Sequence, residues 1–344
     1  MADRLQPHGW LILDKPRGLG STQAVAAVKR NLRAGGHGKV KVGHGGTLDP
    51  LAEGVLPIAL GEATKLAGRM LDASKVYEFT IRFGEETDTL DAEGGVVERS
   101  DVRPTQADIE AILPRFTGPI QQIPPAYSAL MVDGQRAYDL ARAGEEVALA
   151  KRSVEIILLE ILPGRGRGTM QSIVEGHPPQ APGYRPVPLH QPAAGPPPPS
   201  GEDYITLRAH VSKGTYIRSL ARDIARALGT VGHVTYLRRV KAGPFGADQA
   251  ISLDMLNEIG KGARLQDHLL PLEAGLDDIP ALALDPTSAQ AVRQGRELSG
   301  LPHADGLHFA KLGAVPVALM EVAGGTARVV RGFNLPSDVA EYPE

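Results

Sequence analysis

Asp49 is the residue whose surroundings best suit chemistry. It lies in the segment Gly43-His44-Gly45-Gly46-Thr47-Leu48-Asp49-Pro50-Leu51-Ala52, where glycines let the backbone approach a ligand and expose N–H groups to an anion. Pro50 keeps Asp49 out of helical geometry. A carboxylate presented in this way can act as a nucleophile or a base. The alternatives are a turn-forming Asp-Pro at Asp49 and a loop histidine bonded to backbone at His44.

Other catalytic and metal-binding motifs are absent from the sequence. It contains no His-Glu-x-x-His, no Gly-x-Ser-x-Gly and no Gly-x-x-x-x-Gly-Lys-Ser/Thr. The chain has no cysteine, which excludes disulfides, thiolate metal sites and a cysteine nucleophile and fits a reducing cytosol. Asp88, Asp91 and Glu93 have the wrong spacing for a calcium loop. We expect these three acids to lie in a solvated hairpin.

Hydrophobic periodicity predicts the elements that position Asp49. Ser21 can cap a helix in which apolar residues recur at i, i+3 and i+7 from Val25. The segment from Val76 to Phe83 alternates and places Tyr77 on one face of a strand. That position leaves Tyr77 either a core residue or a residue of the site.

Further along the chain, turn and capping signals separate the elements. Thr105 with Asp108 predicts a capping box at the start of a helix. We expect a strand from Ala126 to Val132, because a tight-turn signal, Asp133-Gly134, follows it.

A strand, a turn and a helix follow one another from Ile205 to Gly229. The strand alternates up to Val211 and runs into Lys213-Gly214, and Gly229 closes the helix. Three arginines recur every fourth residue and therefore share one side of that helix; they are Arg218, Arg222 and Arg226. The pattern predicts a cationic ridge beside a site.

Two further regions complete the chain. Residues 163–201 contain the run from Pro196 to Pro199 and too few apolar residues for a core, so we interpret them as a mobile insertion. Its flanks, Val154 to Leu162 and Tyr204 to Val211, read as strands that pair in a hairpin. Short apolar runs from Ile279 to Phe333 predict a small β-rich module.

The charge distribution favours a nucleic-acid partner. The net charge is only −3, but residues 21–48 contain no acid and residues 205–245 contain one, Asp223, among many cations. Two solvated basic faces are the alternative interpretation. Met1 to Trp10 shows no targeting pattern, and no apolar run approaches the ~18 residues of a membrane span. We expect a cytoplasmic protein with no membrane association.

From Trp10 to about Leu256 the sequence resembles the TruB family of bacterial tRNA pseudouridine-55 synthases, with a weaker resemblance beyond. The shared motifs occur in the family's order, and that ordered series is highly specific. They are Leu13-Asp14-Lys15-Pro16, the segment from Gly43 to Ala52, Lys75-Val76-Tyr77, Pro125-Ala126-Tyr127-Ser128-Ala129-Leu130, Ser212-Lys213-Gly214-Thr215-Tyr216-Ile217-Arg218-Ser219-Leu220 and Tyr236-Leu237-Arg238-Arg239.

This resemblance implies an α+β fold. It consists of a catalytic domain at residues 9–256, built around a mixed, mainly antiparallel sheet, and a PUA-like β module at residues 277–335. The insertion at 163–201 departs from the family pattern. By resemblance, Asp49 is the catalytic aspartate and Arg218 pairs with it. The other implied site residues are Tyr77, His44 and Leu237.

The implied reaction converts a uridine in the T arm of tRNA, at position 55, to pseudouridine. The nucleotide has to be flipped out before Asp49 can reach it, and a bidentate arginine would hold the carboxylate ionised. Three routes stay open: attack on the sugar, attack on the ring, and elimination. Isomerisation changes no oxidation state, so we expect no cofactor and no metal.

The resemblance also implies no guide RNA and no obligatory protein partner. A guide-dependent synthase would carry longer lysine-rich tails, and an RNA chaperone would need no pair between Asp49 and Arg218. The basic residues predicted to contact RNA are Lys15, Lys39, Lys41, Lys213, Arg222, Arg238 and Arg239.

Overall fold

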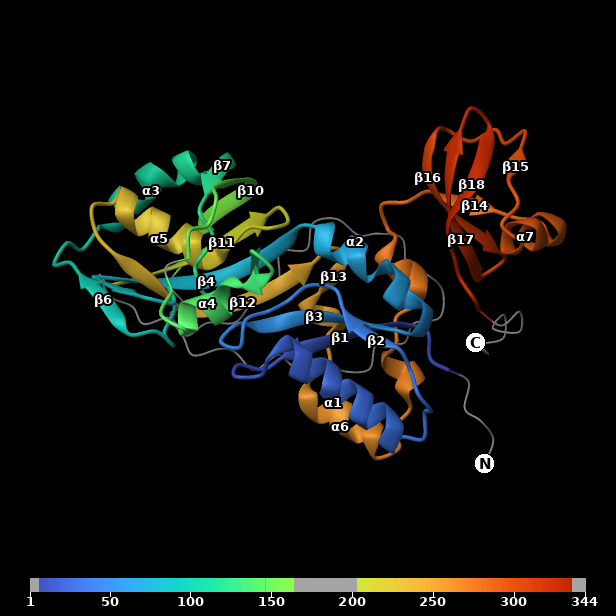
Figure 1. Ribbon diagram of the computed structural model, residues 1–344, viewed down its shortest axis with the longest axis horizontal. Helices are drawn as coiled ribbons and strands as arrows, with labels where there is room; N and C mark the ends of the chain where they lie inside the picture. The colour runs from blue at the N-terminus through green and yellow to red at the C-terminus, as the bar shows by residue number, and fades with distance from the viewer. Residues whose placement is uncertain (1–5, 146, 164–202, 336–344) are drawn as a thin grey trace.

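A nine-stranded sheet organises the larger part of the molecule in the computed structural model, which describes residues 6–145, 147–163 and 203–335 (Figure 1). The strand order is β1-β3-β12-β4-β11-β10-β7, with β2 on β3 and β13 on β12. β12 pairs with β3 in parallel, and the other pairs are antiparallel. The predicted α+β class is confirmed. The strands are β1 (Gly9–Lys15), β2 (Val42–His44), β3 (Glu53–Leu60), β4 (Lys75–Phe83), β7 (Gly118–Gln122), β10 (Arg152–Ile161), β11 (Tyr204–Val211), β12 (Gly232–Ala242) and β13 (Phe245–Gly246).

Helices cover the sheet and enclose its core. α1 packs with α6 against β1 and β3, whereas α5 packs with α3 against the strands around β4 and β11. Figure 1 shows α1 and α6 side by side. The helices are α1 (Ser21–Ala34), α2 (Ala67–Asp72), α3 (Gln106–Ile112), α4 (Ala137–Arg142), α5 (Ile217–Ala227) and α6 (Leu253–Gly260). Two short hairpins add β5 (Glu85–Thr87) with β6 (Val96–Arg99), and β8 (Met131–Val132) with β9 (Gln135–Arg136).

The C-terminal module is a five-stranded sheet in the order β14-β16-β17-β18-β15, as the predicted β-rich character requires. A helix that the sequence reading missed, α7 (Pro286–Arg293), is capped by Asp285, whose carboxylate accepts from the backbone N–H groups of Thr287 and Ser288. The module's apolar residues Phe309, Leu319 and Phe333 join the cluster around Trp10 of β1. The strands are β14 (Ala281–Ala283), β15 (Leu298–Ser299), β16 (Gly306–Leu312), β17 (Val315–Ala323) and β18 (Thr326–Gly332).

Several local predictions are confirmed. Thr105 accepts from the Asp108 N–H at 3.2 Å and the Asp108 carboxylate accepts from the Thr105 N–H at 2.9 Å. Asp133 and Gly134 have φ of 49° and 84° and join β8 to β9. Gly229, with φ of 72°, follows α5. β10 and β11 pair antiparallel as the predicted hairpin, while residues 164–202 between them lie outside the described residues.

Two local predictions were wrong. The capping residue of α1 is Gly20 and not Ser21, which is the first residue of the helix. The Ser21 hydroxyl does not cap the helix, because it donates to the Leu48 carbonyl and accepts from the Leu48 N–H, each at 2.8 Å. The predicted strand from Ala126 to Val132 is a strand only at its last two residues. Before them the Ser128 N–H turns back to the Ala126 carbonyl instead of joining a ladder.

The limits predicted for the two domains, 9–256 and 277–335, stay predictions. Leu256 lies inside α6 and β14 begins at Ala281. In the described part of the chain, no helix is long and apolar enough to cross a membrane.

Candidate active site

Asp49 and Arg218 form an ion pair, as the resemblance implies. Arg218 Nη2 donates to Asp49 Oδ2 at 2.8 Å and to the Tyr127 carbonyl at 2.9 Å, while Nη1 donates to the Thr89 carbonyl at 2.8 Å. The contact joins one nitrogen to one oxygen, so the expected bidentate pair is not the observed geometry. The Arg218 side chain is 6% exposed and that of Asp49 39%. The guanidinium is therefore fixed, and the carboxylate faces open space.

Asp91 is a second acid on the same guanidinium, and the expectation of a solvated hairpin was wrong for it. Asp91 is buried and its Oδ2 lies 3.3 Å from Arg218 Nη1. The other oxygen accepts from the Thr89 hydroxyl at 2.6 Å and the Glu93 N–H at 3.0 Å. An acid-rich stretch reads as surface in a sequence, and only the packing of α5 brings Arg218 to it.

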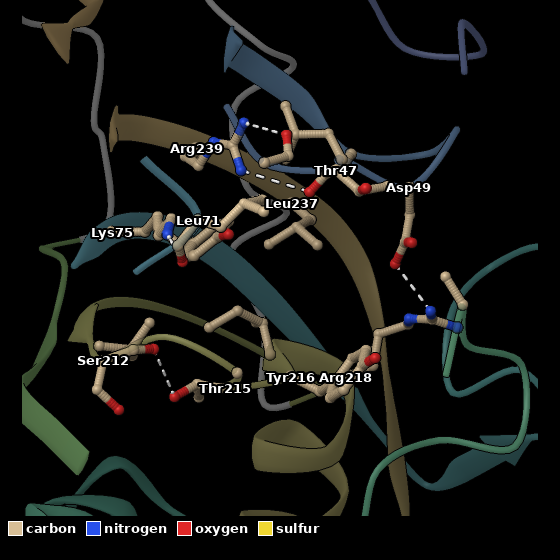
Figure 2. Close-up of a pocket in the computed structure, with 18 of the residues that line it drawn as sticks. Thr47, Asp49, Leu71, Lys75, Ser212, Thr215, Tyr216, Arg218, Leu237 and Arg239 are labelled. Carbon is tan, nitrogen blue, oxygen red and sulfur yellow. Dashed lines mark hydrogen bonds and ion pairs between the residues drawn. The ribbon is translucent and has the colours of Figure 1, made fainter. Parts of the chain in front are cut away.

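A cavity of about 570 Å³ lies beside this ion pair. Four of the five predicted active-site residues line it together, namely Asp49, Tyr77, Arg218 and Leu237, and so does Arg239 from the predicted RNA contacts. Figure 2 shows Asp49 and Arg218 facing each other on one side and Lys75 and Arg239 on the other, with Leu237 between them. An acid, a fixed arginine and an apolar wall therefore surround one space large enough for a small ligand.

His44 lies at the end of β2 and is not among the residues that line this cavity. Its Nδ1 accepts a long hydrogen bond, 3.4 Å, from the Gly46 N–H. Burial, and to a lesser extent the nearby Arg239 charge, hold the pKa of His44 below its usual value. His44 therefore favours the neutral form beside the loop that carries Asp49.

Lys15 and Arg239, both predicted to contact RNA, are buried, at 0% and 1% exposure. Lys15 Nζ donates to the carbonyls of Leu19, Pro16 and Pro50 at 2.6, 3.0 and 3.3 Å. Burial lowers the pKa of Lys15 to about 8, against the opposing charges of Asp49 and Glu53. Both side chains bond backbone carbonyls within the fold, and their contact with RNA remains a prediction.

The predicted cationic ridge on α5 is largely neutralised. Arg222 Nε bonds Asp223 at 2.9 Å, and Arg226 bonds Glu86 at 2.8 Å. Arg238 on β12 likewise contacts two acids, Asp14 at 2.8 Å and Glu53 at 3.2 Å. The sequence reading assigned the charge of these arginines to RNA, but in the structure each arginine pairs with a carboxylate of the protein.

Three other predicted RNA contacts are exposed. Lys39 and Lys41 lie between α1 and β2. Lys213 precedes α5 and pairs with the equally exposed Asp72 at 2.9 Å, an interaction that contributes little in water.

Lys75 is a residue of the cavity that the sequence reading did not single out. Its Nζ donates to the carbonyls of Ala73, Leu71 and Met70 at 2.6, 2.7 and 2.9 Å, and so caps the C-terminal end of α2. Burial, and next the Arg239 charge, lower the pKa of Lys75 to about 8. The motif Lys75-Val76-Tyr77 was the available signal, but nothing in it indicates three carbonyl partners.

Two family models match the chain. The model for the N-terminal domain of TruB family pseudouridylate synthases matches residues 30–175, and that for the C-terminal domain of tRNA pseudouridylate synthase B matches residues 218–277. A Novosphingobium aromaticivorans protein named tRNA pseudouridine synthase B is 63% identical over 97% of this chain and 99% of its own length. The chain belongs to the TruB family. A Zymomonas mobilis protein of the same name is 53% identical over 95% of this TruB-family chain and 96% of its own.

Solved structures show the same fold. A chain in the structure of an H/ACA RNP bound to a substrate RNA containing 2'-deoxyuridine has a TM-score of 0.65 and 24% identity, covering 96% of this chain and 86% of that one. A chain of the archaeal box H/ACA sRNP Nop10-Cbf5 complex has a TM-score of 0.62 at 24% identity, with 96% and 87% covered. Family membership makes this TruB-family protein an enzyme, a pseudouridine synthase of the isomerase class.

Proposed function

We propose that this enzyme converts a uridine of tRNA, at position 55 of the T loop, to pseudouridine without a guide RNA and with Asp49 as the catalytic group. The relatives at 63% and 53% identity are named for tRNA, and the resemblance of the motifs supplies position 55. The ion pair of Asp49 with Arg218 at the cavity is the observation that carries the assignment.

The pair suits a carboxylate that has to work in a partly dry site. A bound nucleotide would exclude water from Asp49, which by itself disfavours the charged form. Arg218 opposes that effect with a charge-assisted hydrogen bond of 2.8 Å. Because Asp91 and two backbone carbonyls fix Arg218, its guanidinium is already oriented before substrate binds.

Tyr77 and Leu237 supply the surface for the base. Both line the cavity, and both are partly buried where two apolar clusters of the core meet. A uridine in a folded T loop is stacked, so it has to rotate out of the RNA to enter. The phenol ring of Tyr77 can then stack on the uracil or move a proton.

The reaction exchanges two bonds within one nucleotide. The bond from N1 of uracil to C1′ of ribose breaks, the bond from C5 to C1′ forms, the proton of C5 is released and N1 gains a proton. The uracil has to remain enclosed while it rotates. In these steps Asp49 acts as nucleophile or base. Its carboxylate faces the cavity, where the sugar would lie.

The sequence identities to known proteins support independence from a guide RNA. The relatives titled as parts of H/ACA assemblies are 24% identical to this chain. Those at 63% and 53% are named for tRNA and match nearly end to end.

Tritium release from unmodified tRNA labelled at C5 of uridine, with purified protein alone, tests the proposal. We expect release at position 55 by the wild type and none by Asp49→Asn, which removes charge and nucleophilicity but little volume. The variant's affinity for tRNA is expected to stay within a few-fold of the wild type. Turnover by Asp49→Asn would assign the chemistry to another residue, and a requirement for added RNA would refute guide independence.

A further inference from the structure

Arg239 is a buried cation whose polar contacts are to neutral groups. It is 1% exposed, and within the described ranges no carboxylate forms an ion pair with it. Its Nε donates to the Val55 carbonyl at 2.7 Å, Nη2 to the Gly46 carbonyl at 3.2 Å and Nη1 to the Thr47 carbonyl at 3.4 Å. Burying a charge without a counter-ion lowers the stability of the fold. The presence of Arg239 is therefore not explained by stability alone.

The three carbonyls belong to parts of the site that have to be held in register. Gly46 and Thr47 lie three and two residues before Asp49 in its loop, whereas Val55 belongs to β3. Arg239 itself lies two residues after Leu237 on β12, so the two side chains share one face of the strand. Both line the cavity (Figure 2). One guanidinium thus links the loop of Asp49 to the wall that carries Leu237.

Two glycines allow this close approach. Gly54 pairs with Arg239 across the parallel strands and has φ of 101°; a Cβ there would lie 2.2 Å from the Arg239 carbonyl oxygen. At Gly46, with φ of 134°, a Cβ would meet Arg239 Nη1 at 3.5 Å. Side chains at either position would strain the backbone or separate it from the arginine.

Other contacts hold the loop at the two neighbours of Asp49, Leu48 and Pro50. The Pro50 carbonyl accepts from the Gly18 N–H at 2.7 Å and from Lys15 at 3.3 Å, and Ser21 holds Leu48. Upstream of Leu48, Arg239 bonds the carbonyls of both Gly46 and Thr47, whereas His44 bonds only the Gly46 N–H.

We infer that Arg239 is a positioning residue: it sets the place of Asp49 relative to the base wall at Leu237 and makes no contact with tRNA phosphate. The inference rests on the proposed function. Because a misplacement of about 1 Å between reacting groups can cost about 100-fold in rate, changing Arg239 is expected to slow chemistry far more than it weakens tRNA binding.

The test uses Arg239→Lys, which keeps the charge but loses the planar fork, and Arg239→Gln, which keeps donors but loses the charge. Single-turnover rates at saturating tRNA are compared with dissociation constants. We expect the rate to fall at least about tenfold in Arg239→Lys and further in Arg239→Gln, with affinity within about threefold. Arg82→Lys is the matched control, an arginine on β4 that is 40% exposed and pairs with Glu85; its rate is expected to stay unchanged.

Amide hydrogen exchange of the free proteins reports the loop directly. In both variants we expect faster exchange at Gly45 and Leu48, whose N–H groups bond Pro57 and Ser21, and unchanged exchange in α5. This measurement needs no turnover, so it tests the positioning role even if the wild type proves inactive on tRNA, which would refute the proposed function instead.

Three results would overturn the inference. Weaker tRNA binding with an unchanged saturating rate would make Arg239 a phosphate contact. Unchanged exchange at Gly45 and Leu48 would remove the loop from its control. Failure of both variants to fold would make Arg239 a stability residue.

Discussion

At the scale of single residues, burial separates arginines that the sequence presents as equivalent. Arg218, Arg222 and Arg226 recur on one side of α5, yet their side chains are 6%, 12% and 55% exposed. Each also contacts a different acid. Of these three arginines, only Arg218 lines the cavity. The regular spacing therefore contains one residue of the site and two residues that lie outside it.

Arg218→Lys is expected to lower the rate of pseudouridine formation at least about tenfold more than Arg222→Lys. Arg218 spans two acids and two carbonyls with its planar fork, which a lysine cannot reproduce. Arg222 serves as the matched control because it lies one turn along the same helix. Single-turnover assays of both variants decide the matter, and equal losses would reduce Arg218 to an ordinary basic residue.

Lys75 makes the stability of the protein depend on pH in a defined direction. Its pKa is about 8 in the folded protein and about 10.5 in the unfolded chain, so between these values the unfolded state binds more protons. The free energy of unfolding of the wild type, relative to Lys75→Met, is therefore expected to rise with pH above about 8, by at most about 1.4 kcal/mol per pH unit.

Urea denaturation of both proteins below and above pH 8 measures this difference. Arg99→Met is the control, an exposed arginine that stays charged throughout the range. A difference that stays constant or falls with rising pH would show that Lys75 is not held with a lowered pKa.

At the scale of elements, the parallel contact of β12 with β3 assembles the site. It places Arg239 beside Gly54 and Arg238 beside Glu53, and so brings the loop that follows β2 against the strand that carries Leu237. The approach depends on the missing side chain at Gly54, where backbone lies 2.2 Å from the place of a Cβ.

Gly54→Ala is accordingly expected to lower the free energy of unfolding by more than about 2 kcal/mol, since the Cβ would clash with backbone and φ of 101° disfavours an L-residue. Gly68→Ala in α2 is the matched control. No atom lies within 4 Å of its Cβ position, and alanine in a helix gains about 0.5–1 kcal/mol. Thermal and urea unfolding of both variants gives the comparison; equal effects would mean that β3 can move away from β12.

At the scale of the whole molecule, ion pairs within the fold reduce the cations available to RNA. Arg222, Arg226 and Arg238 each contact acids, and Lys15 and Arg239 are buried. Exposed cations remain between α1 and β2, at Lys39 and Lys41. The basic segment at residues 21–48 is therefore a better candidate RNA surface than the one at residues 205–245.

Affinity for tRNA is expected to fall steeply with salt, with a log–log slope of about −0.7 to −0.9 for each phosphate neutralised. Lys39→Glu and Lys41→Glu should each make the slope shallower by about one such increment. Charge reversal at Arg115, an exposed arginine on the β7 side of the sheet, is the comparison. Filter binding across a salt series measures the slopes, and an unchanged slope in the lysine variants would remove this surface from the interface.

The sequence by itself determined the local structure and the chemistry. The capping box at Thr105, the turn at Asp133-Gly134 and the pairing of β10 with β11 depend on near neighbours or on the alternation within a strand, which a sequence displays directly. The motif around Asp49 and the order of the other motifs identified the family before any geometry was known.

Tertiary structure alone decided which charges meet. Asp49 and Arg218 are 169 residues apart in the chain, and Gly46 and Arg239 are 193 apart, so their contacts depend on the order of strands in the sheet. The same holds for the burial of Lys15 and Asp91. A charged residue looks alike in a sequence whether water or a ring of carbonyls surrounds it, and only folding, which sets the cost of its desolvation, distinguishes the two.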